Sequence, residues 1–400
     1  MQNKDIQLIM PELRSEIGLR LQKLLPLIGE AGLDAVLLAS NANVFYMAGR
    51  FFRGYVYVNR EGRLIFFLIR PNCFHADGEE VIAIRKPELI PAALQQLGIA
   101  MPEKLGLETE ALSYSDVERL RRIFPDAQLG NASEVMKKCR MTKTPFELRL
   151  MREDGQHQMA AYSKISRLYK RDMTDVELQV EIERILRLEG NLGFLRTSGN
   201  LMEINLGSVI SGENADAPSP YDFAMGGAGV SPALPCGANG DIMKTGQTVM
   251  IDMNGCFNGW QTDMTRVWTI GDVPPLAREA HECSRRILRE LEKLARPGVE
   301  VCELYERAHA IVEEEGLESY FMGHRQQAAF IGHGVGIELN EAPAITPKCR
   351  VKLLENMTLA IEPKFVSPGV GAVGVENTYV VTPDGLDNMT PFPEELTDLL

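Results

Sequence analysis

The sequence is short of the residues on which many metal and thiol sites depend. Its 400 residues include only six histidines, and its seven cysteines form no CxxC pair. A cysteine zinc site or a disulfide framework is therefore not expected, and the thiols are interpreted as reduced, as in a cytoplasmic protein. Because histidines are so few, a metal site in this chain has to rely on carboxylates.

Excess positive charge and long apolar runs are also missing. The chain has 42 basic and 55 acidic residues and a net charge of −13, which argues against nucleic acid or an anionic membrane as the main partner. No apolar run reaches the roughly 18 residues that a membrane span needs. Residues 1–10 lack the basic and apolar regions of a signal peptide. We therefore expect a cytoplasmic protein.

The length predicts two domains, because a single core rarely grows beyond about 250–300 residues. Up to about residue 135, strand patterns alternate with helix patterns, which predicts an α/β domain over residues 1–135. The second domain is expected over residues 136–400, where a basic stretch leads into the helix start Thr144-Pro145. Its expected helices span about 145–170, 174–189, 275–294 and 301–315.

Two acidic residues lie in a predicted β-hairpin over residues 247–268. Apolar residues flank a turn-rich centre with two Asn-Gly pairs, which is a hairpin signal. If the chain reverses between Phe257 and Asn258, Asp252 faces Asp263. Like charges directly opposite on neighbouring strands are destabilising, so a bound cation is the natural remedy.

The same arrangement recurs near the C-terminus, where two strand patterns flank a turn centred on Gly369 and Glu362 faces Glu376. Between the two hairpins, glycines on both sides of His333 allow close approach of the backbone to a ligand. Four carboxylates and one imidazole suit manganese, cobalt, iron or zinc. Their four negative charges balance two divalent cations, which can activate a bridging water and polarise a carbonyl oxygen. The pattern predicts a two-metal hydrolytic centre.

Each of these residues also has an ordinary alternative role. Asp252 alone could simply end a strand beside a turn, and His333 alone would more often be a packed core histidine than a ligand. The five together make a purely structural explanation much weaker.

These residues resemble the metal ligands of the pita-bread metallopeptidases, a family that includes methionine aminopeptidase, aminopeptidase P, prolidase and creatinase. The family's ligand order is Asp, Asp, His, Glu, Glu, which is matched here by Asp252, Asp263, His333, Glu362 and Glu376. The neighbouring sequence also matches, in an Asp-x-Thr-Arg run from Asp263, a Gly-His-Gly-x-Gly run around His333 and a Glu-Pro pair at Glu362.

The resemblance implies a role for each ligand. Asp252 would bind one ion, and His333 and Glu362 would bind the other. Asp263 and Glu376 would bridge the two ions. Glu362 would also be the catalytic residue that carries a proton for the bridging water. The implied cofactors are two divalent metal ions, manganese or cobalt, with zinc and iron as alternatives.

The first third of the chain resembles the creatinase/prolidase N-terminal domain, at residues 32–38 and 43–49. The resemblance therefore implies an α/β N-terminal domain over 1–135, followed by an α+β pita-bread catalytic domain over 136–400. It favours the prolidase and aminopeptidase P branch, whose members are hydrolases that cleave beside proline and usually form homodimers. A small peptide is the implied substrate.

The outer residues depart from the family pattern. Cys236 and Asn340 stand where the peptidases have histidines, and Gly374 stands where prolidase-like enzymes often have an arginine for the peptide carboxylate. We expect Cys236 and Asn340 to contact the substrate. The missing cation could be replaced by Arg266, His324 or Arg325.

A Gly/Pro-rich insertion over residues 216–235 predicts either a flexible loop or a lid over the metals.

The departures from the family pattern at Cys236, Asn340 and Gly374 leave two alternatives to an Xaa-Pro metallopeptidase. One is a metal-dependent enzyme of this fold that acts on a non-peptide small molecule. The other is a non-catalytic binding protein.

Overall fold

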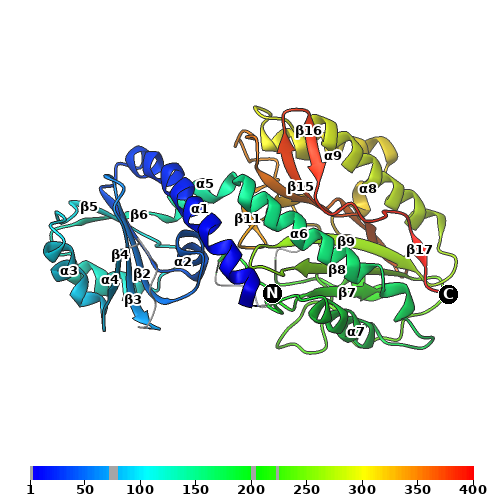
Figure 1. The fold of residues 1–400 in the computed structure, drawn as a ribbon. Coiled ribbons are helices and arrows are strands. Elements are labelled where there is room, and N and C mark those ends of the chain that lie inside the picture. Colours follow the sequence, from blue (N-terminus) through cyan, green and yellow to red (C-terminus); the bar gives the residue numbers. More distant parts are fainter. Residues whose placement is uncertain (1–2, 72–79, 200–203, 222–224) are drawn as a thin grey trace. The chain divides into compact units, whose positions relative to one another are not determined.

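The computed structural model describes residues 3–71, 80–199, 204–221 and 225–400 (Figure 1). It divides into two compact units, Met1–Arg140 and Met141–Leu400. The division falls near the end of helix α5 (Ser133–Met141), the helix that also contains the expected boundary at 135/136. No helix in the described part of the chain is long and apolar enough to span a membrane.

The first unit is built on a six-stranded mixed sheet with the order β4-β3-β2-β1-β5-β6. Its strands are β1 (Ala35–Leu38), β2 (Arg53–Asn59), β3 (Leu64–Arg70), β4 (Glu80–Ala83), β5 (Lys104–Leu107) and β6 (Gln128–Asn131). Its other helices are α1 (Asn3–Glu30), α2 (Asn41–Ala48), α3 (Ile90–Gln96) and α4 (Tyr114–Ile123). Strands β2 and β3 form an antiparallel hairpin.

Four long helices frame the second unit: α6 (Pro145–Tyr162), α7 (Asp175–Leu188), α8 (Pro275–Leu294) and α9 (Val301–Glu315). Helices α6 and α7 both begin with a capping box, in which a threonine and a glutamate satisfy each other's main-chain N–H groups. Helix α6 ends before the expected residue 170, because the chain turns at Ser163 and buries Ile165 in a short 3-10 helix. The other three predicted helices are confirmed closely.

The strands of the second unit form a four-stranded sheet, β17-β9-β8-β7, a five-stranded sheet, β11-β10-β12-β15-β16, and the pair β13-β14. The first sheet contains β7 (Gly207–Ser211), β8 (Thr248–Gly255), β9 (Thr262–Thr269) and β17 (Thr397–Asp398). The others contain β10 (Gly332–Gly334), β11 (Glu341–Ala344), β12 (Thr358–Ile361), β13 (Lys364–Ser367), β14 (Gly371–Gly374), β15 (Asn377–Thr382) and β16 (Gly385–Asn388).

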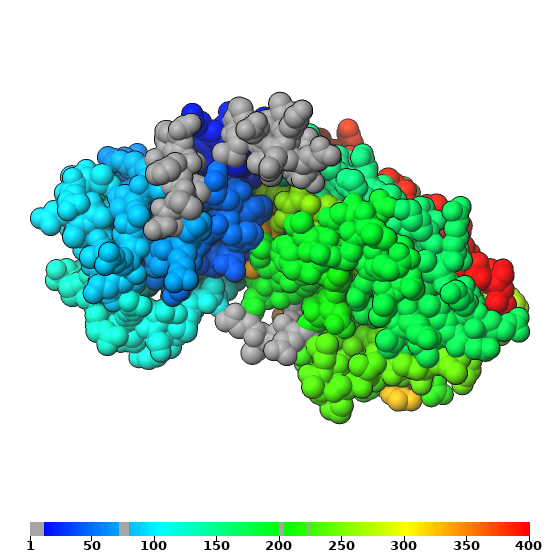
Figure 2. Space-filling model, turned by 60° about the horizontal axis from the view of Figure 1, so that its bottom comes forward, coloured from blue at the N-terminus to red at the C-terminus, as the bar shows by residue number. Residues whose placement is uncertain are grey.

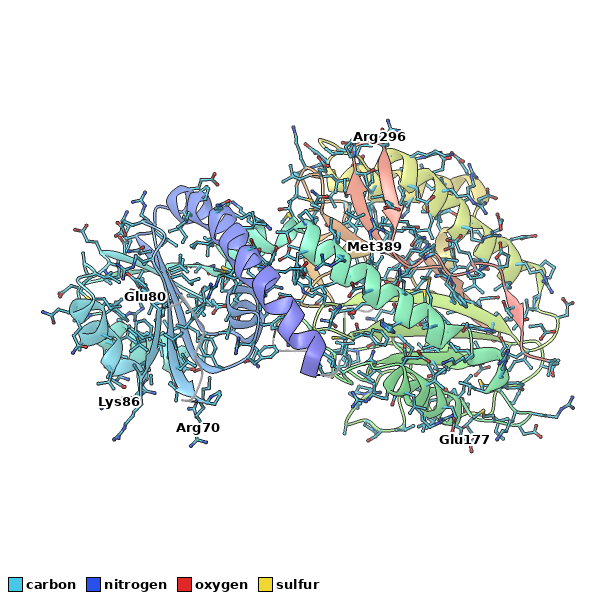
Figure 3. The ribbon with its side chains drawn as sticks, viewed as in Figure 1. Arg70, Glu80, Lys86, Glu177, Arg296 and Met389 are labelled. Carbon is cyan, nitrogen blue, oxygen red and sulfur yellow. The ribbon has the colours of Figure 1, made fainter. Side chains whose placement is uncertain are left out.

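The strands of the second unit lie between two layers of helices. Helices α6 and α7 pack on β7, β8 and β9, and α8 packs on β13, β14 and β16. On β8, Ile251 and Met253 join the apolar core beneath α6 and α7, and Asp252 therefore points to the opposite face, since side chains alternate along a strand. Figure 2 shows one face of the molecule, on which the segments between α6 and β8 gather in green. Charged side chains such as Glu177 and Arg296 are exposed at the surface, whereas Met389 is buried (Figure 3).

The register of the β8–β9 hairpin differs from the predicted one. Asp252 lies opposite Thr265, and Asp263 lies opposite Asn254, so the prediction that the two aspartates face each other directly is wrong. The turn is held one position later, because Asn258 donates from its side chain to the main-chain oxygen of Leu150 at 2.9 Å. A shift of two residues keeps both aspartates on one face as diagonal neighbours.

The predicted pairing about Gly369 is confirmed. Ile361 pairs with Asn377 between β12 and β15, and Lys364 pairs with Gly374 between β13 and β14. These two residue pairs have the same register and flank Glu362 and Glu376, so Glu362 lies opposite Glu376.

Asp154 of α6 anchors the β8–β9 turn by accepting the main-chain N–H of Phe257 at 3.0 Å. Burial raises the pKa of its carboxyl well above the ordinary value. Because the pKa of this carboxyl is higher in the folded state, its protonated form stabilises the fold. This contribution is complete below the unfolded pKa of about 3.9 and is lost as the pH rises through the folded-state pKa. Asp154→Asn stays neutral and is therefore expected to raise the thermal midpoint at pH 8 but not at pH 4. Thermal unfolding of both proteins across this range measures the difference, and a difference that is independent of pH would contradict the prediction.

Candidate metal centre

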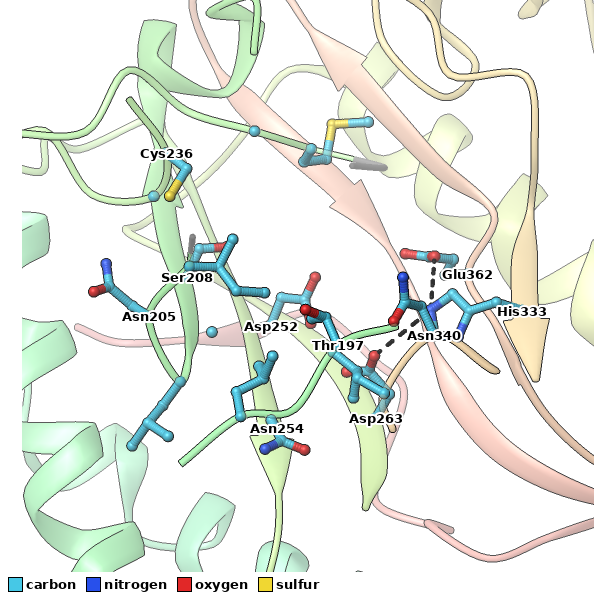
Figure 4. Close-up of a pocket in the computed structure, with 18 of the residues that line it drawn as sticks. Thr197, Asn205, Ser208, Cys236, Asp252, Asn254, Asp263, His333, Asn340 and Glu362 are labelled. Carbon is cyan, nitrogen blue, oxygen red and sulfur yellow. Dashed lines mark ion pairs between the residues drawn. The ribbon is translucent and has the colours of Figure 1, made fainter. Parts of the chain in front are cut away.

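The five predicted ligands come together in the second unit, although they lie on five separate segments of the chain. Their ligand atoms form two groups, within each of which all atoms lie within 4.8 Å of one another. The groups are Asp263, His333 and Glu376, and Asp252, Glu362 and Glu376. Glu376 belongs to both groups, as expected of a bridging ligand, whereas Glu362 falls in the group of Asp252 and the resemblance assigned it to the ion of His333. Figure 4 shows Asp252, Asp263, His333 and Glu362 converging from β8, β9, β10 and the end of β12.

His333 presents one ring nitrogen to the carboxylates. Its Nδ1 lies 3.0 Å from the main-chain oxygen of Gly334, and a hydrogen bond there keeps the proton on Nδ1. Its Nε2 lies 3.8 Å from Asp263 Oδ2 and 3.7 Å from Glu362 Oε1 (Figure 4). This is the tautomer that a metal-binding histidine needs, with the lone pair on the nitrogen that faces the site.

The carboxylates are crowded and largely buried. Burial and, after it, the neighbouring Glu362 raise the pKa of Glu376 to about 8. Burial and the neighbouring carboxylates likewise hold the pKa of Asp263 well above its ordinary value. Glu376 Oε1 has no hydrogen-bond partner among the described residues, and a buried carboxylate oxygen is costly unless a donor or cation contacts it. The donor set of oxygens and one imidazole nitrogen fits a divalent ion.

Lys364 is the residue at this centre that the sequence analysis missed. Its Nζ donates to Asp252 Oδ2 at 2.8 Å, to Glu362 Oε2 at 2.7 Å and to Glu376 Oε2 at 3.2 Å. Burial opposes its charge, but the three carboxylates raise its pKa well above the ordinary value. A signal was present in the sequence: Lys364 stands in an apolar strand two positions after Glu362, and lysine is almost never fully buried without a partner.

Thr265 holds the shared ligand from β9. Its hydroxyl donates to Glu376 Oε2 at 2.7 Å, and it is the cross-strand neighbour of Asp252. The observed register thus places a hydrogen-bond donor, in place of a second carboxylate, directly opposite Asp252.

A pocket of about 120 Å³ opens beside the carboxylates. Cys236 and Asn340 both line it (Figure 4). Asn340 Oδ1 accepts the main-chain N–H of Ser198 at 2.7 Å, and burial raises the pKa of the Cys236 thiol. The other neutral polar residues that line the pocket are Thr197, Asn205, Ser208 and Asn254. None of the described residues that line this pocket is a lysine or an arginine.

Arg266 and His324 do not line this pocket. Arg266 is buried, and its guanidinium donates to main-chain oxygens, including those of Glu376, Thr390 and Phe392. It therefore ties β9 to the segments that precede β15 and follow β16. His324 Nδ1 lies 2.9 Å from Asp216 Oδ2, beside a separate cavity of about 160 Å³.

The insertion contributes to both cavities. Its described residues Met225 and Gly226 line the pocket beside the carboxylates and also the cavity at His324. Residues 222–224 of the insertion lie outside the described part of the chain. Whether the segment acts as a lid stays a prediction.

Comparison with known protein families gives two matches that together span most of the chain. Residues 20–142 match the Creatinase/Prolidase N-terminal domain, and residues 149–383 match Metallopeptidase family M24. The expected order, a creatinase/prolidase-like α/β domain followed by a pita-bread catalytic domain, is confirmed.

Similar proteins match over nearly their whole length. The chain is 27% identical over 386 residues to an Xaa-Pro dipeptidase of Pyrococcus furiosus, covering 94% of this chain and 99% of that protein. Its fold is similar to that of an Xaa-Pro dipeptidase from Bacillus anthracis, with a TM-score of 0.80, 23% identity and coverage of 95% and 99%. An X-Pro aminopeptidase from Thermotoga maritima gives a TM-score of 0.77 at 22% identity, with coverage of 94% and 99%. At these identities the likeness of the structures establishes the fold alone.

Proposed function

Because the chain belongs to metallopeptidase family M24, we propose that it is a metal-dependent hydrolase that cleaves small peptides beside proline. The observation that carries this proposal is the convergence of four carboxylates and one imidazole beside a pocket that the imidazole and three of the carboxylates line. The relatives named Xaa-Pro dipeptidase support the substrate class. A homodimer and a cytoplasmic location stay predictions.

The two groups of ligands define two cation positions. Asp263, His333 and Glu376 would hold a divalent ion at one, and Asp252, Glu362 and Glu376 surround the other. Manganese or cobalt is the proposed metal, and zinc and iron suit the same donors. Divalent ions at such a centre lower the pKa of a bound water and polarise the carbonyl oxygen of the substrate.

Glu362 is the proposed proton carrier. It lines the pocket, and its Oε1 lies 3.7 Å from His333 Nε2. A carboxylate in this place can take a proton from the attacking water and pass it to the departing amine. The hydrogen bond from Lys364 to Oε2 fixes the other oxygen, which leaves Oε1 on the side of His333.

The residues that line the pocket favour a substrate whose C-terminal carboxylate lies outside this pocket. Leu195, Ile204 and Leu206 suit a small apolar residue such as proline. A dipeptide would bring its C-terminal carboxylate to this pocket, where the described lining offers no lysine or arginine. We therefore favour peptides of three or more residues, as for an aminopeptidase that releases the residue before proline.

A peptide panel tests the function. With manganese or cobalt added, Xaa-Pro-Yaa tripeptides are expected to be cleaved with a kcat/KM at least about tenfold higher than that of Xaa-Pro dipeptides. The missing charge-assisted contact is worth about 1.5–3 kcal/mol, and each 1.36 kcal/mol corresponds to a factor of ten. Matched peptides with alanine in place of proline control for specificity. If no peptide is cleaved, the proposal fails, and a non-peptide small molecule becomes the better candidate substrate.

A further inference from the structure

Lys364 occupies the centre of one of the two ligand groups. Its Nζ contacts one oxygen from each of Asp252, Glu362 and Glu376, at 2.7–3.2 Å. These residues are the members of one group of carboxylates that could hold a metal ion. We propose that the Lys364 ammonium is the resident cation of this group, so that the chain binds one divalent ion tightly, at Asp263, His333 and Glu376, instead of two.

The geometry satisfies the ammonium completely. A lysine ammonium has three N–H donors and no acceptor, and here three carboxylate oxygens accept from it. A divalent ion held by these three oxygens would have to lie about 2.0–2.2 Å from each of them. The ion and the ammonium therefore compete for the same oxygens.

The lysine has no open path away from the carboxylates. Its side chain is 0% exposed, and it is not among the residues that line the pocket. Displacement by a second ion would leave a fully buried ammonium without its three carboxylate partners, which is strongly unfavourable.

The residue across the strand pair makes room for the lysine. Lys364 pairs with Gly374, and a Cβ atom at position 374 would lie 2.9 Å from Lys364 Cα and 3.2 Å from Lys364 Cγ. Gly374 has a φ of 140°, which is strained for any other residue. The glycine that stands in place of the expected arginine is therefore the partner that accommodates this lysine.

The charges are compatible with a single ion. Four carboxylates, one ammonium and one divalent ion give a net charge of −1 at the centre. With the ammonium retained, a second divalent ion would change this to +1. With one ion bound, each group holds one cation: the Lys364 ammonium lies among Asp252, Glu362 and Glu376, and the divalent ion lies among Asp263, His333 and Glu376.

The experiment counts metal ions on the full chain, without substrate. The purified protein is stripped with a chelator, equilibrated with manganese, freed of unbound ions and measured by elemental analysis. Wild type is expected to hold one ion per chain and Lys364→Gln two. The control is Lys293→Gln, which removes the charge of an exposed lysine outside the centre, and is expected to hold one. Two ions on wild type, or one ion on Lys364→Gln, would overturn the inference.

A second measurement needs no variant and covers the case in which Lys364→Gln does not fold. Electron paramagnetic resonance of manganese-loaded wild type is expected to show the resolved hyperfine lines of an isolated ion. The broadened spectrum of two coupled ions would overturn the inference. The inference rests on the metal centre of the proposed function but not on its substrate. A chain that binds one ion and cleaves no peptide would therefore contradict the proposed function alone.

Discussion

Glu376→Gln is expected to lower kcat/KM about a thousandfold and to remove most of the bound divalent ion. Glu376 is the one residue shared by both ligand groups, and its buried Oε1 has no hydrogen-bond partner among the described residues. Glutamine keeps the shape of the side chain but removes the negative charge that a cation needs. The loss of several kcal/mol of electrostatic stabilisation corresponds to about three factors of ten.

Metal content and peptide hydrolysis should be measured on the same preparation of Glu376→Gln. The matched control is Glu292→Gln, which changes a half-buried glutamate that accepts from Tyr379 at 3.0 Å, away from the ligand groups. This control is expected to keep its ion and its activity. A Glu376→Gln protein with full metal content and near wild-type kcat/KM would contradict the assignment of Glu376 as a ligand.

Lys143→Met is expected to lower the free energy of unfolding of the second unit by about 3–5 kcal/mol, the range for breaking a buried ion pair. Lys143 Nζ lies 3.1 Å from Glu341 Oε2, and the side chains are 0% and 5% exposed. Removal of the ammonium leaves the Glu341 charge buried. Glu341 also accepts the main-chain N–H of Ile337 at 2.9 Å, so the pair stabilises the turn that carries Asn340 to the pocket.

Urea unfolding followed by tryptophan fluorescence suits this test, because both tryptophans, Trp260 and Trp268, lie in the second unit. The double variant Lys143→Met/Glu341→Gln should recover part of the loss, since it no longer buries the Glu341 charge without the Lys143 ammonium. Lys293→Met, at a side chain that is 72% exposed, should change the stability by less than about 0.5 kcal/mol. A loss of similar size in Lys293→Met and Lys143→Met would refute the role of the buried pair.

Local patterns in the sequence predicted the elements that bring the five ligands together. Helix α8 begins at Pro275 as expected, since proline lacks a main-chain N–H and is favoured at a first helical position. The pairing of Glu362 with Glu376 also followed from one Pro/Gly turn at Gly369. In these places a single local signal dominates, and the folded chain offers no competing arrangement.

The details that the sequence could not supply depend on contacts between distant segments. Two Asn-Gly pairs allowed two registers for the β8–β9 hairpin, and groups on α6, including Asp154, select between them. Lys364 was missed because no local pattern shows that the interior of the unit brings its ammonium to three carboxylates. Arg266 was misjudged as a substrate candidate for the same reason, since all but one of its acceptors among the described residues lie more than a hundred residues away in the chain.

The position of Glu376 in both ligand groups has a thermodynamic consequence. Two cations that draw on one carboxylate cannot bind independently, and the coupling free energy between them is the same in both directions. The cation that occupies the group of Asp252, Glu362 and Glu376 therefore influences the affinity of the ion at His333. The Lys364 ammonium is attached to the polypeptide and is therefore always present at the same effective concentration. The occupancy of a second free ion would instead vary with the metal concentration in the cell. The chain can in this way keep the affinity of its one exchangeable ion constant.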